Sequence, residues 1–332
     1  MKFYLLHIFR YLRCFTIRRA ANALKCRCSF FFARIGVLHY DYMPLFVALE
    51  PADWCILKCR QCLVGLAGNR EITQRHIMKP ELYHKVIDET APYAHTLILH
   101  FQGEPLLSPY LEDMVAYAHK KRLFTVFSTN AQLLDSKRAE ELAKAGLDEI
   151  IISLDGLTQE SYTAYREGGS INRVFEGIRA MSNIERGHRP EIVVQCLMLK
   201  SNETEWDEMR RCYKQLGADR LVFKTAQFYD FEHGNYNMPS DNRYCRYYQD
   251  KQGAWHIKKP LLNRCYRLWS GCVITAIGDV RPCCYAKSKE VSFGNITNHS
   301  LKDVLRGGKA IDFRKKLFTN RKSISICCNC DE

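Results

Sequence analysis

The segment FVALEPADWCILKCRQC, residues 46–62, decides the fold class of this chain. It joins an apolar run, typical of a buried strand, to a loop that carries Cys55, Cys59 and Cys62. A structural zinc site takes four ligands and a disulfide takes two cysteines, so three thiols fit neither. Three thiolates can each bind one iron of a [4Fe–4S] cubane and leave the fourth iron open. The spacing therefore predicts a cluster whose open position binds a small molecule.

Short β-rich runs alternate with amphipathic helical stretches over the following part of the chain. Counting the first, six runs are expected to form strands, at residues 45–50, 96–101, 124–129, 149–154, 191–199 and 220–225. This alternation predicts an α/β fold with a parallel sheet that helices cover. Six strands without an evident seventh indicate a partial (β/α)6 barrel, with functional residues at the carboxyl ends of the strands.

The alternation stops after Thr225, and the chain then changes texture. We expect four parts: a basic amphipathic helical extension at 1–44, the barrel at 45–228, a linker at 229–262 and a small C-terminal domain at 263–332. In the last part, CVITAIGDVRPCC reads as a hairpin that turns at Gly278-Asp279.

Four further segments stand near the ends of the expected strands. They are FQGEPLL (101–107), FSTNAQLL (127–134), ISLDG (152–156) and AYREGG (164–169). Together with CILKCRQC, in this order, they resemble the motifs of radical S-adenosylmethionine (SAM) enzymes. The resemblance covers roughly residues 45–332, and several motifs in order are far more specific than one cysteine spacing.

The resemblance implies a set of cofactor ligands. Cys55, Cys59 and Cys62 would hold a [4Fe–4S] cluster, and SAM would chelate its open iron. Gly103 and Glu104 would meet the amino group of SAM. The remaining implied contacts with SAM are Gln102, Asn130, Ser153 toward the ribose and carboxylate, and Arg166 toward the carboxylate. The chain departs from the family at Gln61, where many members have an aromatic residue near adenine, and at Gln102, which replaces a glycine.

A second cysteine set lies in the C-terminal part and consists of Cys265, Cys283, Cys327 and Cys330. It resembles the C-terminal domain called SPASM in its truncated form, Twitch, which implies one auxiliary [4Fe–4S] cluster. A structural zinc ion takes the same four thiolates and stays an alternative. The doublets Cys283-Cys284 and Cys327-Cys328 leave two ligands ambiguous. Cys272 is expected to be a buried strand residue.

The first 40 residues carry eight basic side chains and no acid, whereas the whole chain has 49 basic and 36 acidic residues. The net charge of +13 therefore arises mainly in this head and does not indicate a nucleic-acid partner. No apolar run is long enough to span a bilayer or resembles a signal peptide, so we expect a cytoplasmic protein. The head is expected either to pack on the main domain or to lie on an anionic membrane surface.

The resemblance implies an enzyme that cleaves SAM reductively to a 5′-deoxyadenosyl radical, which takes hydrogen from a substrate. An auxiliary cluster would favour a net oxidation or a cross-link, and flavodoxin or ferredoxin would serve as the reductant. The substrate is expected to be a peptide or a sugar-like small molecule. No catalytic acid or base can be named from the sequence. The alternative is a non-catalytic iron–sulfur or zinc scaffold or sensor, which would require a fourth protein ligand near Cys62.

Overall fold

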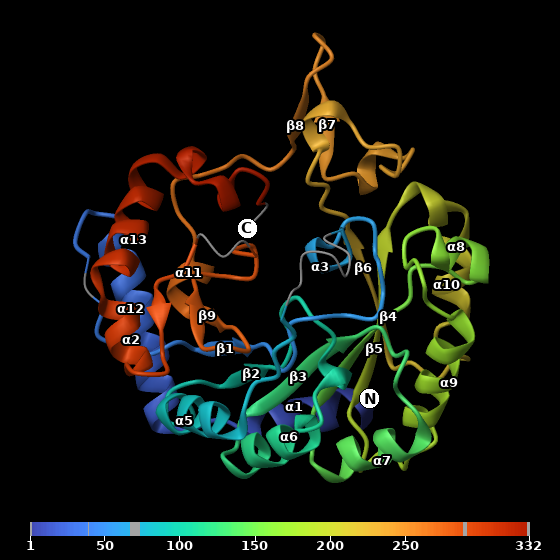
Figure 1. Ribbon diagram of the computed structural model, residues 1–332, viewed down its shortest axis with the longest axis horizontal. Helices are drawn as coiled ribbons and strands as arrows, with labels where there is room; N and C mark the ends of the chain where they lie inside the picture. Colours follow the sequence, from blue (N-terminus) through green and yellow to red (C-terminus); the bar gives the residue numbers. More distant parts are fainter. Residues whose placement is uncertain (1, 39, 67–73, 288–290, 331–332) are drawn as a thin grey trace.

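The computed structural model describes residues 2–38, 40–66, 74–287 and 291–330, and a nine-stranded sheet forms its centre (Figure 1). The strand order is β11-β10-β9-β1-β2-β3-β4-β5-β6, and β1 to β6 run parallel. These six are β1 Phe46–Leu49, β2 Thr96–Ile98, β3 Phe124–Thr129, β4 Glu149–Ser153, β5 Glu191–Met198 and β6 Arg220–Thr225. They coincide with the six predicted runs, which confirms the α/β partial barrel.

Helices cover the outer face of the parallel strands, where they form the outer ring in Figure 1. They are α5 Pro80–Thr90, α6 Leu111–Lys120, α7 Ser136–Lys144, α8 Gln159–Thr163, α9 Ile171–Ser182 and α10 Trp206–Cys212. Asp135 fixes where α7 begins, because its side chain accepts the N–H of Arg138. One face of α9 is apolar and buried, and it consists of Ile171, Val174, Ile178 and Met181.

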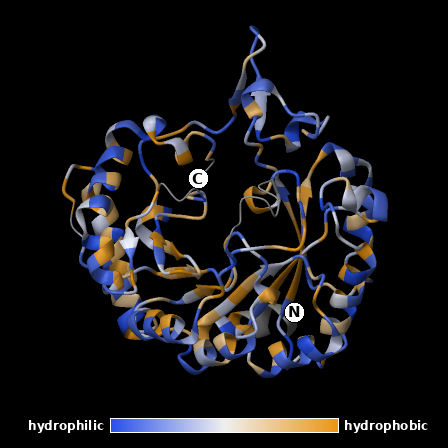
Figure 2. Cartoon of the chain, in the orientation of Figure 1, coloured by the Kyte–Doolittle hydropathy of each residue, from blue (hydrophilic) through white to orange (hydrophobic). Residues whose placement is uncertain are grey.

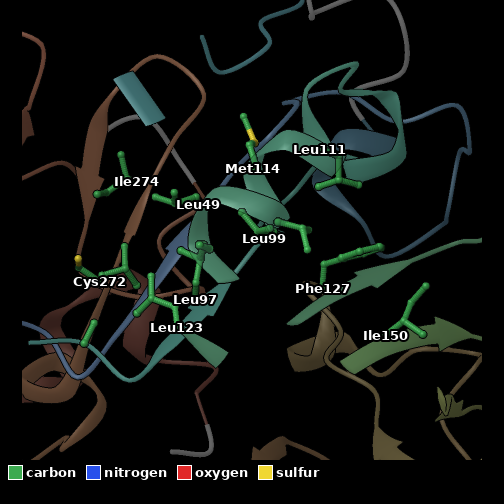
Figure 3. Packing of buried hydrophobic residues seen from close by; sticks show 14 of the residues in the cluster. Leu49, Leu97, Leu99, Leu111, Met114, Leu123, Phe127, Ile150, Cys272 and Ile274 are labelled. Atoms are coloured by element: carbon green, nitrogen blue, oxygen red, sulfur yellow. The ribbon is translucent and has the colours of Figure 1, made fainter. Parts of the chain in front are cut away.

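The main core lies between the sheet and these helices. Figure 3 shows Leu97 and Leu99 near β2 and Phe127 on β3 beside Leu111 and Met114 of α6. Figure 2 shows mainly hydrophobic residues along the strands and many hydrophilic residues on the outer helices. Burial of this apolar surface stabilises the fold and holds the strand ends in fixed positions. Those strand ends carry most of the predicted site residues.

The C-terminal part extends the barrel sheet. It contains α11 Arg267–Ser270, β9 Gly271–Ile274, β10 Asp279–Arg281, β11 Gly294–Asn295, α12 Leu301–Arg306 and α13 Gly308–Asn320. β9 pairs in parallel with β1, so that Cys272 lies opposite Val47. β10 then runs back antiparallel after Gly278, whose φ of 87° suits a glycine. The hairpin prediction is confirmed, and Cys272 is the expected buried strand residue.

The predicted linker at 229–262 contains a small sheet that the sequence did not predict. β7 Tyr247–Gln249 pairs antiparallel with β8 Trp255–Ile257, and the two project away from the barrel in Figure 1. Asp250 organises the turn between them by accepting the N–H groups of Gln252 and Ala254. Strands of three residues are too short to show a period in the sequence, which explains the difference.

Two helices form the head, α1 Lys2–Arg13 and α2 Ile17–Ala33. Arg13 of α1 forms an ion pair of 2.9 Å with Asp148, which directly precedes β4. Arg19 of α2 is buried and donates to the carbonyl oxygens of Ala91 and Lys121. The head therefore packs on the barrel, as one of the two interpretations expected. Within the described ranges, no helix combines the length and the apolar character needed to cross a membrane.

Candidate functional site

The loop after β1 folds back on itself and is hydrogen-bonded to two other segments. The N–H of Cys62 donates to the carbonyl oxygen of Cys59 at 3.1 Å, which closes a turn just before α3 Leu63–Leu66. The N–H of Lys58 donates to Glu167, and the carbonyl oxygen of Trp54 accepts the N–H of Glu104. These backbone bonds hold the cysteine loop against the segments that follow β2 and β4.

The three thiols of this loop lie close enough to influence one another. Cys59 is buried, and Cys55 and Cys62 are half-buried. The pKa of Cys55 is raised to about 12, chiefly by burial and also by the negative charges of Glu104, Cys59 and Cys62. Burial also raises the pKa of Cys59, while Arg166 lowers it. The thiol of Cys55 is therefore protonated when it is free, and a metal centre is the kind of partner that stabilises it as a thiolate.

Gly103 and Glu104 stand directly against this loop. A Cβ atom on Gly103 would lie 2.1 Å from the carbonyl oxygen of Ala52, so the approach requires glycine. The buried carboxylate of Glu104 accepts from Thr129 Oγ1 at 2.6 Å, from the N–H of Asn130 at 2.9 Å and from the N–H of Leu106 at 3.1 Å. A carboxylate offers about four acceptor positions, so one remains for an ammonium group.

Gln102 connects the same segment to the C-terminal part. Its N–H donates to Glu50 Oε1, and its side-chain amide donates to the carbonyl oxygen of Lys287 at 3.2 Å. Glu50 Oε2 also accepts the N–H of Ala276. The structure thus engages the Gln102 amide with the C-terminal segment, and its predicted contact with SAM stays a prediction.

Asn130 and Ser153 occupy the ends of β3 and β4. Asn130 is buried, and its side-chain amide lies 3.4 Å from Cys55 Sγ, so the structure brings it to the cysteine loop. Ser153 is the last residue of β4, is buried and lies opposite Gln195 of β5. Both residues stand at the carboxyl edge of the sheet, where parallel-sheet enzymes build their sites.

Arg166 has a protein carboxylate as its partner, which sequence reasoning missed. Its Nε donates to Asp155 Oδ2 at 2.6 Å, and its Nη1 lies 3.8 Å from Cys59 Sγ. Burial lowers the pKa of Arg166, but Asp155 and Cys59 outweigh burial and raise it above the ordinary value. The only sequence signal for Asp155 was its place in ISLDG, directly after a strand. The predicted contact of Arg166 with SAM stays a prediction.

The second cysteine set also converges. Burial raises the pKa of Cys283, and the thiolates of Cys284, Cys265 and Cys327 add to this effect. Cys327 and Cys330 are both buried, and the N–H of Cys330 donates to the carbonyl oxygen of Cys327. The four predicted residues thus come from three separate segments to one place.

A buried arginine beside this set was not predicted from the sequence. Arg321 is 1% exposed, and the thiolates of Cys330, Cys265 and Cys327 raise its pKa although burial lowers it. A buried cation offsets the negative charge of thiolates. Cys328, by contrast, is exposed, and its thiol donates to the carbonyl oxygen of Lys322. In the doublet Cys327-Cys328, the structure therefore favours Cys327 as the ligand. In the doublet Cys283-Cys284, both residues are half-buried, so exposure does not favour one of them as the ligand.

In the part of the chain that the structure describes, no three His, Cys, Asp or Glu side chains lie close enough together to bind a single metal ion. His76, the histidine that follows the cysteine loop, is held by Asp53, with its Nδ1 2.7 Å from Asp53 Oδ2.

Comparison with protein families matches two models. Residues 49–212 match the radical SAM superfamily, and residues 265–331 match SPASM, an iron–sulfur cluster-binding domain. The chain therefore belongs to the radical SAM superfamily. It carries the SPASM domain as its C-terminal part, which favours iron–sulfur over zinc at the second cysteine set.

Curated relatives have different activities. The PqqA peptide cyclase of Granulibacter bethesdensis is 27% identical over 56% of this chain and 48% of its own length. The GTP 3′,8-cyclase of Clostridium botulinum is 25% identical over 77% of this chain and 85% of its own length. The chain spans about half the length of most of the curated relatives that it matches.

Solved structures share the fold at low sequence identity. SuiB of Streptococcus suis bound to SAM has a TM-score of 0.65 and 16% identity, over 87% of this chain and 72% of its own. Native anSMEcpe with bound SAM has a TM-score of 0.62 and 16% identity, over 86% and 88% of the two chains. These likenesses show a common fold.

The side chains present fit the cofactors of this family, which are a [4Fe–4S] cluster, SAM and an auxiliary iron–sulfur site. Three thiols come together at the first site, as the effect of Cys59 and Cys62 on the pKa of Cys55 indicates. Gly103 leaves a space that a Cβ would fill, and Glu104 keeps an acceptor position for an amino group. Buried thiols gather at the second site around Arg321.

Proposed function

We propose that this protein removes a hydrogen atom from a substrate held inside the barrel, and that the net reaction is an oxidation or a cross-link. The observation that supports this proposal is a cavity of about 370 Å³ within the barrel. Residues of β1, β2 and β6 line it, and so do Cys283 of the second set and its neighbour Cys284. A substrate in this cavity lies beside the auxiliary site, which suits transfer of an electron to it.

The cofactors would supply the radical chemistry: reductive cleavage of SAM would provide the acceptor of a hydrogen atom, and the auxiliary cluster would take the second electron, which the substrate loses with a proton after the hydrogen atom has left. In the proposal, Cys55, Cys59 and Cys62 bind the first cluster, and Cys265, Cys283, Cys327 and Cys330 bind the auxiliary one. Gly103 and Glu104 receive the amino group of SAM. Gln102, Asn130, Ser153 and Arg166 complete the SAM pocket. Flavodoxin or ferredoxin is the proposed reductant.

The charge of the cavity indicates the kind of substrate. Lys224, Arg267 and Lys287 line it, and none of its described lining residues is an aspartate or a glutamate. Cations around a partly enclosed space favour an anionic ligand, because they attract it and reduce the cost of its desolvation. We infer that the substrate carries a carboxylate or a phosphate. Both candidate classes, peptides and sugar-like molecules, include such anions.

His100 is suited to donate a hydrogen bond in this cavity. Its Nδ1 accepts the N–H of Ser128 at 3.0 Å, which places the proton of the neutral ring on Nε2. The pKa of His100 is lowered to about 4, chiefly by burial and also by the nearby cations Lys224 and Arg267. The ring is therefore neutral near pH 7, and it acts as a hydrogen-bond donor rather than as a base.

The relatives support both substrate classes. One curated relative is a cyclase of the PqqA peptide, and one SuiB structure has the precursor peptide SuiA bound. Another relative is a GTP 3′,8-cyclase, and the BtrN structure, with a TM-score of 0.56, contains SAM and 2-DOIA. A peptide with a free carboxylate and a phosphorylated or carboxylated sugar are the substrates to test first.

Release of 5′-deoxyadenosine tests the chemistry. The protein, reconstituted anaerobically with iron and sulfide, is given dithionite and SAM, and the products are separated by chromatography. We expect 5′-deoxyadenosine from the wild type, none from Cys59→Ala, and a normal amount from the control Cys28→Ala, whose thiol is exposed on the head. A fully loaded wild type that leaves SAM intact would contradict the proposal.

Matched substrate pairs test the charge of the cavity. Peptides with a free or an amidated C-terminus, and sugars with or without phosphate, are compared by the mass change that SAM produces. We expect product from an anionic member only, and a value of kcat/KM lowered about tenfold or more in Lys224→Glu, with Lys251→Glu on the exposed β7–β8 turn as control. Equal turnover of the neutral members would refute the anionic substrate without affecting the radical chemistry.

A further inference from the structure

Helix α2 buries three polar side chains, Arg19, Asn22 and Ser29, and exposes large apolar side chains beside its other cations. Its buried residues are Arg19, Asn22, Cys26, Ser29 and Ala33. Three large apolar side chains at intervals of seven residues face solvent instead: Ile17 is 85% exposed, Leu24 66% and Phe31 58%. A surface helix of a globular protein normally has the opposite arrangement. The reversed orientation is the first sign that the outer face of α2 has a function.

The inward face is fixed by specific hydrogen bonds, so the helix cannot simply be rotated. Besides its bonds to Ala91 and Lys121, Arg19 donates to the carbonyl oxygen of Arg122 at 2.6 Å. The side chain of Asn22 donates to the carbonyl oxygen of Met43 at 2.8 Å and accepts the N–H of the same residue at 2.9 Å. Turning these groups out would break buried hydrogen bonds, so the fold itself holds the apolar face outward.

The exposed apolar surface is concentrated on the head. Eleven of the seventeen exposed large hydrophobic residues of the described chain lie between residues 8 and 37. They include Leu12 and Phe15 before α2, and Phe32 and Ile35 at its end. Scattered exposed apolar residues are ordinary, but such a gathering marks a site of interaction. We call the exposed residues Ile17, Leu24, Phe31, Phe32 and Ile35 the apolar face.

A groove opens on the same helix and combines aromatic walls with cationic edges. It has a volume of about 520 Å³, and Phe30, Phe31, Phe32 and Tyr266 line it together with Arg27 and Arg34. An acyl chain fits aromatic walls, and guanidinium groups at the edge suit a phosphate headgroup. The groove therefore has the chemistry of an anionic lipid.

The charge of the head favours an anionic membrane, rather than a second copy of the chain, as the partner of the apolar face. The head carries eight basic residues and no acid in residues 1–40, and Arg18, Lys25, Arg27 and Arg34 are exposed. A symmetric dimer would bring the same face of two copies together and would place these cations against one another. A membrane with anionic lipids accepts both the apolar side chains and the cations.

We propose that the apolar face of α2 and its groove dock the protein on the surface of a membrane that contains anionic lipids. The helix lies in the interface without crossing it. In Figure 1, β7 and β8 lie at the top of the view, whereas α2 lies at its left edge. This docking does not depend on the radical reaction, and it would bring the enzyme to substrates made at a membrane.

Sedimentation with vesicles tests the docking. The full chain is mixed with vesicles of phosphatidylcholine alone or of phosphatidylcholine with phosphatidylglycerol, and the bound fraction is measured. We expect the wild type to bind the mixed vesicles. The affinity should fall by at least about tenfold in Leu24→Asp and in Phe31→Ser. Ile277→Asp, a change at an exposed apolar residue far from the head in sequence, is the matched control and should bind like the wild type. Because the replaced side chains face solvent, the thermal unfolding temperature should stay within a few degrees; Phe31→Ser serves if Leu24→Asp does not fold.

Each other outcome overturns the proposal. Equal binding to both kinds of vesicle would refute the requirement for anionic lipid. Absence of binding, or binding that neither substitution weakens, would refute the assignment to α2. A dimer in light scattering that Leu24→Asp dissociates, without vesicle binding, would show that a second copy covers the face.

Discussion

Arg166 and Asp155 form an ion pair at the centre of the first site, with Arg166 Nε 2.6 Å from Asp155 Oδ2. The Asp155 side chain is fully buried, and that of Arg166 is 15% exposed. The second carboxylate oxygen of Asp155 accepts the N–H of Leu197 at 2.6 Å, and Arg166 Nη1 lies beside Cys59 Sγ. The pair therefore joins the ends of β4 and β5 to the cysteine loop.

Replacing Asp155 with asparagine should destabilise the protein strongly. The substitution keeps the shape but leaves the charge of Arg166 without its carboxylate, a change that typically costs about 3–5 kcal/mol. The free energy of unfolding in urea measures this cost. Asp241→Asn removes the partner of the exposed Arg243 and is the control, with stability close to the wild type. An equally small effect of both substitutions would show that Asp155 is not needed to compensate Arg166.

Adding one methyl group at Gly103 should prevent correct assembly of the SAM pocket. Alanine would place its Cβ 2.1 Å from the carbonyl oxygen of Ala52, so the segment after β2 has to move away from the cysteine loop. We expect SAM affinity to fall at least about tenfold, because small displacements of positioning groups are costly. Equilibrium binding of SAM to the reconstituted protein measures the loss.

The control for this substitution is Gly187→Ala. No atom lies within 4 Å of a Cβ built on Gly187, so this change should leave SAM affinity as in the wild type. If Gly103→Ala bound SAM as tightly as the wild type, the loop at Ala52 could move without loss, and close packing against Gly103 would not be required.

The sequence was informative where local patterns decide the structure. The six barrel strands and the turn at Gly278 follow from apolar runs, helical periods and turn residues. The parallel pairing of β9 with β1 joins residues more than two hundred positions apart, and no local pattern contains it. The strands β7 and β8 bury Tyr247 against Phe228, but each strand has only three residues, so no period marks them in the sequence.

Charges inside the protein were the least predictable part of the site. Neither Asp155 nor Arg321 was identified as a site residue from the sequence, because charged side chains are usually exposed. Their function depends on partners that only the tertiary structure supplies, Arg166 in one case and the converging thiols in the other. The outward orientation of the apolar face of α2 was also not predictable, because the period of a helix shows two faces but not which face packs on the protein.

In the doublet Cys327-Cys328, we expect only Cys327 to bind the auxiliary cluster. Cys327 is buried beside Arg321 and Cys330, whereas Cys328 is exposed and bonds to Lys322. We expect Cys327→Ala to lose about four iron atoms per chain, the content of one cubane, and Cys328→Ala to keep them. Iron analysis and the visible absorption of the reconstituted proteins measure this. The reverse result, with loss in Cys328→Ala only, would assign the ligand to the second cysteine.

The carboxyl group of Glu50 should make stability depend on pH. Glu50 is 3% exposed at the end of β1, and burial raises its pKa to about 7. The ordinary value is 4.5, so the folded protein binds the proton more tightly than the unfolded chain does. This group's contribution to stability is therefore most favourable below pH 4.5, falls as the pH rises, and levels off above pH 7.

Glu50→Gln removes this titration and should flatten that part of the profile. The pKa difference corresponds to about 3 kcal/mol in the free energy of unfolding. Relative to the wild type, the variant should therefore be more stable by about this amount at pH 8 than it is at pH 4.5. Urea unfolding at both pH values measures the difference between the two proteins, so the titration of other groups cancels. Glu81→Gln, at an exposed position on α5, is the control and should leave the profile as it is. A constant difference between Glu50→Gln and the wild type at the two pH values would show that Glu50 stays ionised in the folded protein, held by the N–H groups of Gln102 and Ala276.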